Sequence, residues 1–270
     1  LKTVLADKEG AWQPLVYCWR GGQRSGAFAT ILHQVGWRVQ LLQGGYQSFR
    51  RTVVKQLYHR PLTHKIVLIE GGTGTAKTAL LNHITAAGVH ILDLEELAGH
   101  RGSLFGGVNG HQPPQKMMET RLAFALARLN PDKTTFVEAE SSKIGERLIP
   151  PSLWAQMSKA QRIHIDAPID ARAMYLCHAY EDLTQDTDHL LSLIDHLRPY
   201  HAAEVIEKWY AQTKNGDWPA LATGLISAHY DPRYAKSAAR KAAPEKAYAL
   251  PDLEADTLAR CAVDLVASFS

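Results

Sequence analysis

The stretch from Lys65 to Ile84, KIVLIEGGTGTAKTALLNHI, constrains the fold of this 270-residue chain most strongly. A short apolar run, Ile66 to Ile69, is followed by three closely spaced glycines, and Lys77-Thr78 then opens a segment with apolar residues on one helical face. A buried strand, a glycine-rich turn and a helix in this order are typical of the phosphate-binding loop G-x-x-x-x-G-K-[ST]. The stretch therefore predicts a parallel α/β domain that binds a di- or triphosphate.

The expected ligands of that phosphate are the loop itself and two side chains. Backbone N–H groups and the positive end of the helix would surround the phosphates, Lys77 would add a point charge, and the Thr78 hydroxyl would bind Mg²⁺. Ala76 stands where the pattern has glycine, and its methyl group can crowd the phosphates. An ordinary glycine-rich turn is the alternative interpretation. The predicted diphosphate site comprises Gly71, Gly72, Thr73, Gly74, Thr75, Ala76, Lys77, Thr78 and Arg101.

Composition sets broader bounds on the chain. With 46% hydrophobic and 21% charged residues, it can form one large or two modest domains with their own cores. No apolar run reaches the length of a membrane span and the first residues lack a signal-peptide pattern, so we expect a cytoplasmic protein. Three widely spaced cysteines argue against a disulfide framework and a cysteine-based zinc site. A net charge of +3 permits nucleic-acid binding without requiring it.

A second motif begins at Cys18, directly after a predicted strand at residues 15–17. The sequence CWRGGQRS leads from this cysteine into a predicted helix, so loop amides, the helix N-terminus and the guanidinium groups of Arg20 and Arg24 would stabilise a thiolate. The C-x5-R spacing serves both cysteine phosphatases and rhodanese-type sulfur-transfer loops, since both bind a tetrahedral anion over the cysteine. We therefore predict Cys18, Arg20 and Arg24 as catalytic residues. A buried structural cysteine is the alternative.

The order of predicted elements divides the chain into three parts. After the Cys18 helix, a strand at 39–42, a Gly-Gly turn and a helix from Gln47 complete a βαβα unit, about half of a rhodanese domain. The chain lacks an initiator Met, and we expect it to begin inside that domain. The predicted domains are a partial rhodanese-like domain at 1–60, a P-loop NTPase-like domain with a helical cap at 61–235, and a C-terminal helical extension at 236–270.

Carboxylates follow the second and third buried strands of the phosphate-loop domain. Asp93 and Glu138 end these strands, and Glu140 follows two residues later. Because the carboxyl ends of parallel strands meet at the ligand-binding edge of a sheet, these acids are candidates for holding the water shell of Mg²⁺. Solvated strand ends are the alternative. The glycine-rich segment 99–110 is a candidate lid with Arg101 as its anion contact, and an uncommitted surface loop is the alternative there.

Seven motifs, taken in order, resemble the bacterial tRNA 2-selenouridine synthases, in which a rhodanese domain is fused to a phosphate-loop domain. They are YCWRGGQRS (17–25), QGGYQSFR (43–50), the phosphate loop (71–78), HRGSLFGG (100–107), QPPQKMME (112–119), VEAESSKIG (137–145) and HYDPRYAKS (229–237). Members of this family act on the wobble uridine of certain tRNAs. They alkylate its 2-thio group with geranyl diphosphate and then replace the geranylated sulfur with selenium from selenophosphate.

This resemblance implies roles for both loops and a set of partners. The phosphate loop would hold geranyl diphosphate, with Mg²⁺, while the Cys18 loop would receive selenophosphate, with Cys18 as nucleophile or selenium carrier. The implied partners are tRNA with a wobble 2-thiouridine, the two small co-substrates and an enzyme that supplies selenophosphate, with no membrane. The expected tRNA contacts are six basic residues, Arg50, Arg51, Lys55, Arg233, Lys236 and Arg240. The sequence departs from the family at Ala76 and lacks the N-terminal rhodanese strands, so we expect a shortened form.

The residues alone leave three other interpretations open. A small-molecule kinase would use the phosphate loop, Asp93 and the lid, but it leaves Cys18 unexplained. A cysteine phosphatase or simple sulfurtransferase would use Cys18 and leave the phosphate loop idle. A tRNA-binding remnant would have lost catalysis through shortening and Ala76. ATP turnover, phosphate-ester hydrolysis, and tRNA binding without product distinguish the three.

Overall fold

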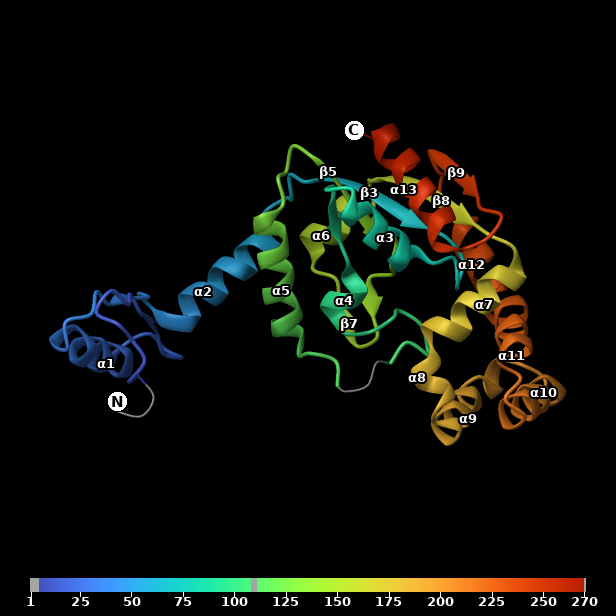
Figure 1. Ribbon diagram of the computed structural model, residues 1–270, viewed down its shortest axis with the longest axis horizontal. Coiled ribbons are helices and arrows are strands. Elements are labelled where there is room, and N and C mark those ends of the chain that lie inside the picture. The colour runs from blue at the N-terminus through green and yellow to red at the C-terminus, as the bar shows by residue number, and fades with distance from the viewer. Residues whose placement is uncertain (1–4, 108–110, 270) are drawn as a thin grey trace. The chain divides into compact units, whose positions relative to one another are not determined.

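The computed structural model describes residues 5–107 and 111–269, and the chain divides into two compact units, Leu1–Arg60 and Pro61–Ser270. The first unit has the predicted βαβα order. Its strands pair in parallel, with Leu15 opposite Gln40. Its elements are β1 (Leu15–Val16), α1 (Gln23–Gln34), β2 (Gln40–Leu41), α2 (Gly45–Val54) and the π-helix η1 (Lys55–His59) (Figure 1).

The first unit has a small core because a two-stranded sheet covers little apolar surface. Val16 and Leu32 are buried, whereas Leu15 and Leu41 on the same two strands are exposed. Two strands alone therefore leave apolar surface open in this unit.

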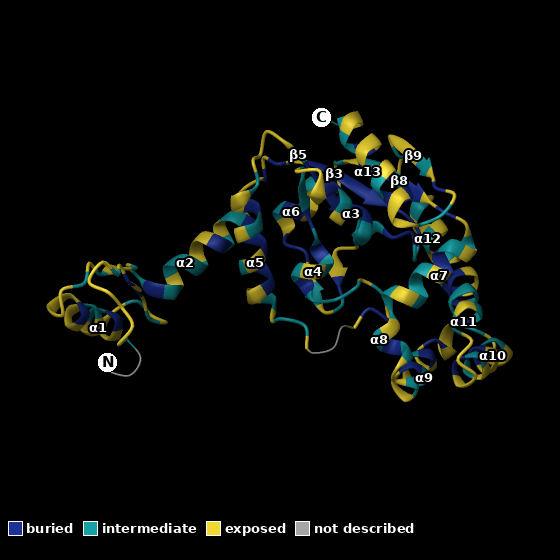
Figure 2. Ribbon diagram, in the orientation of Figure 1, coloured by how far each residue is buried: buried dark blue, intermediate teal, exposed yellow. Residues whose placement is uncertain are grey.

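The second unit is built on a five-stranded parallel sheet with the order β4-β5-β3-β8-β9. The strands are β3 (Lys65–Glu70), β4 (His90–Leu92), β5 (Thr134–Glu138), β8 (Gln161–Asp166) and β9 (Lys246–Ala249). Strand β3 lies in the middle, and from its second residue to its last it is buried, as expected for a central parallel strand covered on both faces (Figure 2). The phosphate loop therefore begins at the centre of the carboxyl edge. The predicted α/β fold with a parallel sheet is confirmed.

Helices cover the sheet. They are α3 (Lys77–Ala86), α4 (Leu94–Ala98), α5 (Gln115–Arg128), α6 (Pro151–Met157) and α13 (Ala255–Phe269), and a short hairpin pairs β6 (Lys143–Ile144) with β7 (Arg147–Leu148). The main core joins the inner side chains of β3, β5 and β8 to the apolar faces of α3 and α13, including Leu80, Ile84, Leu258 and Leu265.

The last 35 residues differ from the prediction of a separate helical extension. Strand β9 adds to the sheet edge beside β8, with Ile163 opposite Lys246, and α13 packs against α3 in the core. The segment belongs to the second unit. This strand was not predicted because KAYA lies at an edge of the sheet. Most of its side chains are exposed, so it lacks the apolar run of the inner strands.

The predicted helical cap is present and has its own core. Phe105, Trp209 and Leu221 lie in an apolar cluster separate from the sheet core. The cap consists of α7 (Ile169–Ala179), α8 (Glu181–Thr184), α9 (Thr187–Asp195), the 3-10 helix η2 (Arg198–Tyr200), α10 (Ala203–Lys214), α11 (Trp218–Leu225), the π-helix η3 (Ile226–Tyr230) and α12 (Asp231–Ala238). Among the described helices, none is both long and apolar enough to cross a membrane.

Candidate active site

The phosphate loop is a tightly packed turn between β3 and α3. A Cβ atom on Gly71 would lie 2.5 Å from the Ile165 carbonyl oxygen, so only glycine fits there. Gly74 has φ +83°, which side-chain-bearing residues rarely adopt. The buried Thr75 hydroxyl donates to the Gly72 carbonyl over 2.9 Å. These contacts fix the loop conformation directly before the N-terminus of α3, where an anion would be favoured.

Ala76 adopts a backbone conformation that favours glycine. Its φ of 56° and ψ of 32° lie in the left-handed region, and it is the one non-glycine residue with positive φ among those the structure describes. The residue is buried and packs in the core cluster that contains Leu80. The left-handed conformation costs an L-residue about 1–2 kcal/mol, and burial of the methyl group offsets part of that cost.

Lys77 and Thr78 lie where the sequence pattern requires them. The Lys77 ammonium donates to the carbonyl oxygens of Gly71 and Gly72 over 3.1 and 3.4 Å. The Thr78 hydroxyl lies 3.4 Å from a Glu95 carboxylate oxygen and 3.5 Å from one of Glu138. The pocket around them is also lined by Arg101, Glu140 and Tyr175. The fold thus gathers most of the residues predicted for the diphosphate and the acid site.

Glu95, which the sequence analysis did not assign, takes the position expected for Asp93. Its backbone N–H donates to Glu138 over 2.7 Å, and its carboxylate faces Thr78. The Asp93 carboxylate instead caps α4 by accepting from the Glu96 amide over 2.7 Å. The sequence held the signal, because Asp93 and Glu96 have the spacing of a capping box. With Asp93 engaged at the N-cap, the half-buried Glu95 of the first turn is the acid that faces the site.

The pKa values of the acidic cluster, which consists of Glu95, Glu138 and Glu140, are all raised. Burial raises the pKa of Glu95 to about 7, and the Glu140 charge adds to the effect. Burial, followed by the charges of Asp93 and Glu95, raises the pKa of Glu138 well above its usual range. Burial also raises the pKa of Glu140, against the opposing influence of Lys77. Burial and the mutual repulsion of the carboxylates therefore both favour protonated forms within this cluster.

These oxygen donors fit Mg²⁺ better than a softer metal. Hydroxyl and carboxylate oxygens are the ligands that Mg²⁺ prefers, and it keeps waters and substrate phosphates as further ligands. Thr78, Glu95 and Glu138 would hold the ion and its water shell. Within the described ranges, no group of three or more His, Cys, Asp or Glu side chains is arranged to hold a metal directly.

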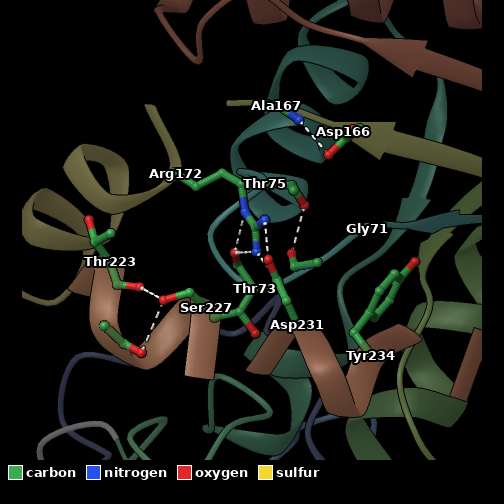
Figure 3. A network of polar contacts seen from close by, with 12 residues as sticks. Gly71, Thr73, Thr75, Asp166, Ala167, Arg172, Thr223, Ser227, Asp231 and Tyr234 are labelled. Carbon is green, nitrogen blue, oxygen red and sulfur yellow. Dashed lines mark hydrogen bonds and ion pairs between the residues drawn. The ribbon is translucent and has the colours of Figure 1, made fainter. Parts of the chain in front are cut away.

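Arg172 braces the phosphate loop from the cap (Figure 3). This buried guanidinium donates to the Thr73 carbonyl through Nε over 2.9 Å and Nη2 over 2.7 Å. It also forms a two-point ion pair with Asp231, at 2.6 and 3.0 Å. Because α7 and α12 supply the two partners, the loop is tied to both helices. Sequence reasoning missed this pair, although Asp231 lies in the HYDPRYAKS motif.

Arg101 is placed differently from the prediction of a simple anion contact. Its guanidinium forms an ion pair with Asp182 over 3.0 Å and lies 4.6 Å from the ring centre of Tyr180. It lines the phosphate pocket from this position. In the described part of the lid, Phe105 is buried in the cap core. The predicted lid residues 108–110 lie outside the described residues.

The Cys18 loop forms a thiolate site in the first unit. Cys18 Sγ accepts from the Gly22 amide and the Ser25 hydroxyl, each over 3.3 Å. The Ser25 hydroxyl, followed by the amides of Gly22 and Ser25, lowers the pKa of Cys18 to about 6. The predicted contribution of the loop amides is present. The guanidinium groups of Arg20 and Arg24 are exposed, and the contribution of the buried Ser25 hydroxyl was not predicted. Ser25 is the third residue of α1, so its contact with Cys18 depends on where the helix begins.

The basic residues predicted to contact tRNA fall on two helices. Arg51 and Lys55 are exposed and four residues apart, while Arg50 is half-buried. Arg233, Lys236 and Arg240 are exposed and spaced by three and four residues, so they share one side of α12 and its C-terminal end. The Arg233 guanidinium also lies 4.4 Å from the ring centre of Tyr200. Both groups are compatible with contacts to tRNA phosphates. Their role in tRNA binding stays a prediction.

The phosphate loop and the acidic cluster lie in the part of the chain that is similar to known proteins. The sequence model of the tRNA 2-selenouridine synthase AAA domain matches residues 64–193, which include the phosphate loop and the acidic cluster. The tRNA 2-selenouridine synthase of Hahella chejuensis is 30% identical over 259 residues, covering 85% of this chain and 67% of that protein. The chain belongs to the tRNA 2-selenouridine synthase family. The family member of Aeromonas salmonicida is 35% identical over 201 residues, covering 71% of this chain and 51% of its own.

The solved structures found by comparison are only weakly similar to this member of the synthase family. TT1252 from Thermus thermophilus has a TM-score of 0.38 at 14% identity, with 77% of this chain and 98% of that one covered. A gluconokinase from Sinorhizobium meliloti has a TM-score of 0.32 at 13% identity, with 77% and 94% covered. Both scores are below 0.5, so the fold assignment rests on the strand order of the chain itself.

Proposed function

We propose that this chain modifies the wobble uridine of tRNA in the cytoplasm, alkylating 2-thiouridine with geranyl diphosphate and then replacing the sulfur with selenium from selenophosphate. One observation carries the first step. A narrow apolar cavity of about 80 Å³ adjoins the phosphate pocket. Geranyl diphosphate has the matching chemistry, since it joins an apolar chain to a diphosphate.

The cavity and the phosphate pocket share a boundary. The residues that line both are Thr73, Ser103, Leu176, Tyr180 and Tyr230. Beyond that boundary the cavity walls are apolar side chains of α7, α8, α9 and α11, together with Phe105. A nucleoside triphosphate carries a ribose and base edges that need hydrogen-bond partners, whereas the exposed lining of this cavity is almost entirely apolar. The cavity therefore favours a prenyl diphosphate over the ATP of a small-molecule kinase.

The proposed alkylation is a displacement at the first carbon of the geranyl chain. The uridine sulfur would form the new bond to that carbon, the carbon–oxygen bond would break, and pyrophosphate would leave with the electron pair. Lys77 and the loop amides would stabilise the charge that develops on the leaving group. Mg²⁺, held by Thr78, Glu95 and Glu138, would neutralise further charge on the diphosphate when bound. Arg172 would keep the loop in position through Thr73.

The proposed selenation uses the first unit. A thiol that is ionised at neutral pH and surrounded by loop amides suits a tetrahedral anion such as selenophosphate. Cys18 would serve as nucleophile or selenium carrier, with Arg20 and Arg24 as anion contacts. An enzyme that makes selenophosphate would supply the co-substrate. The basic groups on α2 and α12 would bind tRNA phosphates, which predicts binding that weakens steeply with salt.

Mass spectrometry of the wobble nucleoside tests both steps. The protein would be incubated with 2-thiouridine tRNA, geranyl diphosphate and Mg²⁺, and selenophosphate would follow. Geranylated nucleoside is expected after the first addition and selenouridine after the second, while Cys18→Ser is expected to stop after geranylation. Unchanged tRNA together with steady ATP turnover would reject the proposal in favour of a kinase.

A further inference from the structure

Helix α11 forms one wall of the apolar cavity beside the phosphate loop. Helix α11 runs along it from Trp218 to Leu225, and both of these residues line it. The chain then passes through η3 to Tyr230, which also lines the phosphate pocket. Seven residues of α-helix span about 10 Å, so Trp218 lies about that far along the wall from Leu225. Since η3 continues directly from α11 to Tyr230, Trp218 marks the end of this wall farthest from Tyr230, which we call the far end.

The residues around that far end differ in how tightly they are held. Leu190 on α9 and Leu221 on α11 are buried members of the cap core. Trp218 is half-buried and packs against the edge of the same cluster. Its indole is therefore the bulky group that can be shortened at the cavity end without opening the core.

We propose that Trp218 sets the length of the apolar chain that the cavity accepts. The inference rests on the proposed function, since it concerns the tail of the same diphosphate. A ten-carbon chain anchored at the phosphate loop would extend toward the indole, and a fifteen-carbon chain would have to displace it. Replacing the indole with a methyl group would lengthen the cavity by the space that the extra isoprene unit needs.

The start of α11 does not depend on the indole, so the variant should fold. The Asp217 carboxylate caps the helix by accepting from the Ala220 amide over 3.3 Å, and a proline follows within the first turn. The matched control is Trp154→Ala, which makes the same change at a partly exposed tryptophan on α6 that does not line the cavity.

Calorimetric titration with three probes tests the inference. Wild-type protein, Trp218→Ala, Trp218→Phe and Trp154→Ala would each be titrated with pyrophosphate, geranyl diphosphate and farnesyl diphosphate, with Mg²⁺ present. Wild type and Trp154→Ala should bind the ten-carbon probe at least about tenfold more tightly than the fifteen-carbon one. Trp218→Ala should lose or reverse that preference, Trp218→Phe should lie between, and all four should bind pyrophosphate equally.

Two results would overturn the inference in distinguishable ways. If Trp218→Ala binds pyrophosphate normally and keeps the full preference for the ten-carbon probe, Trp218 does not set chain length although the proposed function stands. If wild type binds pyrophosphate as tightly as either prenyl diphosphate, the cavity does not hold a prenyl chain, and the proposed geranylation fails together with the inference.

Discussion

The Cys18 thiolate offers the sharpest test of the site in the first unit. Replacing Ser25 with Ala removes the hydroxyl that contributes most to its low pKa, and this side chain is buried, so no solvent-exposed group is disturbed. Three main hydrogen bonds share the depression of the pKa to about 6. Loss of one of them should raise the pKa of Cys18, and with it the midpoint of its pH titration, by about one pH unit.

The effect of Ser25→Ala on the Cys18 pKa must be measured as a shift in the pH midpoint of alkylation. The alkylation rate at a single pH is a poor measure of it. A thiol with its pKa at about 6 is about 90% ionised at pH 7, against about 3% for a free cysteine. A less basic thiolate is, however, a weaker nucleophile, and with a Brønsted slope of about 0.4–0.5 this cancels much of the gain in rate. The alkylation rate at neutral pH would therefore differ only a few-fold from that of an ordinary thiol.

The assay is iodoacetamide alkylation followed by peptide mass spectrometry from pH 4.5 to 10. Burial raises the pKa of Cys177, and burial raises the pKa of Cys261 to about 11, so both should titrate well above Cys18. Cys18→Ser gives the background. A wild-type midpoint near 8.5, or a midpoint that Ser25→Ala leaves unchanged, would refute the role assigned to the hydroxyl.

Four further changes probe the second unit. Lys77→Ala should weaken pyrophosphate binding at least about tenfold in calorimetry, because it removes the charge at the loop; unchanged affinity would contradict that role. Arg172→Lys should weaken the same binding and lower the melting temperature, because a single ammonium cannot hold both Thr73 and Asp231; equal behaviour of the two proteins would count against the brace. Ala76→Gly relieves about 1–2 kcal/mol of strain but loses about 0.8 kcal/mol of methyl burial and about 0.4–1 kcal/mol of unfolded-state restriction, so the free energy of unfolding should change by less than about 1 kcal/mol in urea titration. Because the folded state favours protonated Glu95, the wild-type stability is fully retained below pH 4.5 and falls as the pH rises through about 7. Without Mg²⁺, Glu95→Gln should exceed the wild-type free energy of unfolding by less than about 1 kcal/mol at pH 5 and by up to about 3 kcal/mol at pH 8. An equal difference at both pH values would oppose this assignment.

Local sequence patterns were sufficient for the fold class. The apolar run, glycines and Lys77-Thr78 predicted the strand, loop and helix of the phosphate site, because each signal lies within one continuous stretch. Glu138 was predicted near Thr78 for a simple topological reason, since parallel strands bring their carboxyl ends to one edge. Strand β9 was missed because edge strands need not be apolar.

The sequence by itself determined the two loops, the parallel sheet and the acidic edge, since each follows from backbone periodicity and glycine geometry within short segments. Only the tertiary structure decided which side chains complete the loops. Arg172 and Asp231 are 59 residues apart in sequence and come together beside Thr73. Whether Asp93 or Glu95 faces Thr78 depends on where α4 starts. The shape of the apolar cavity was likewise undecided, because it depends on how the cap helices pack against one another and leave space beside the phosphate loop.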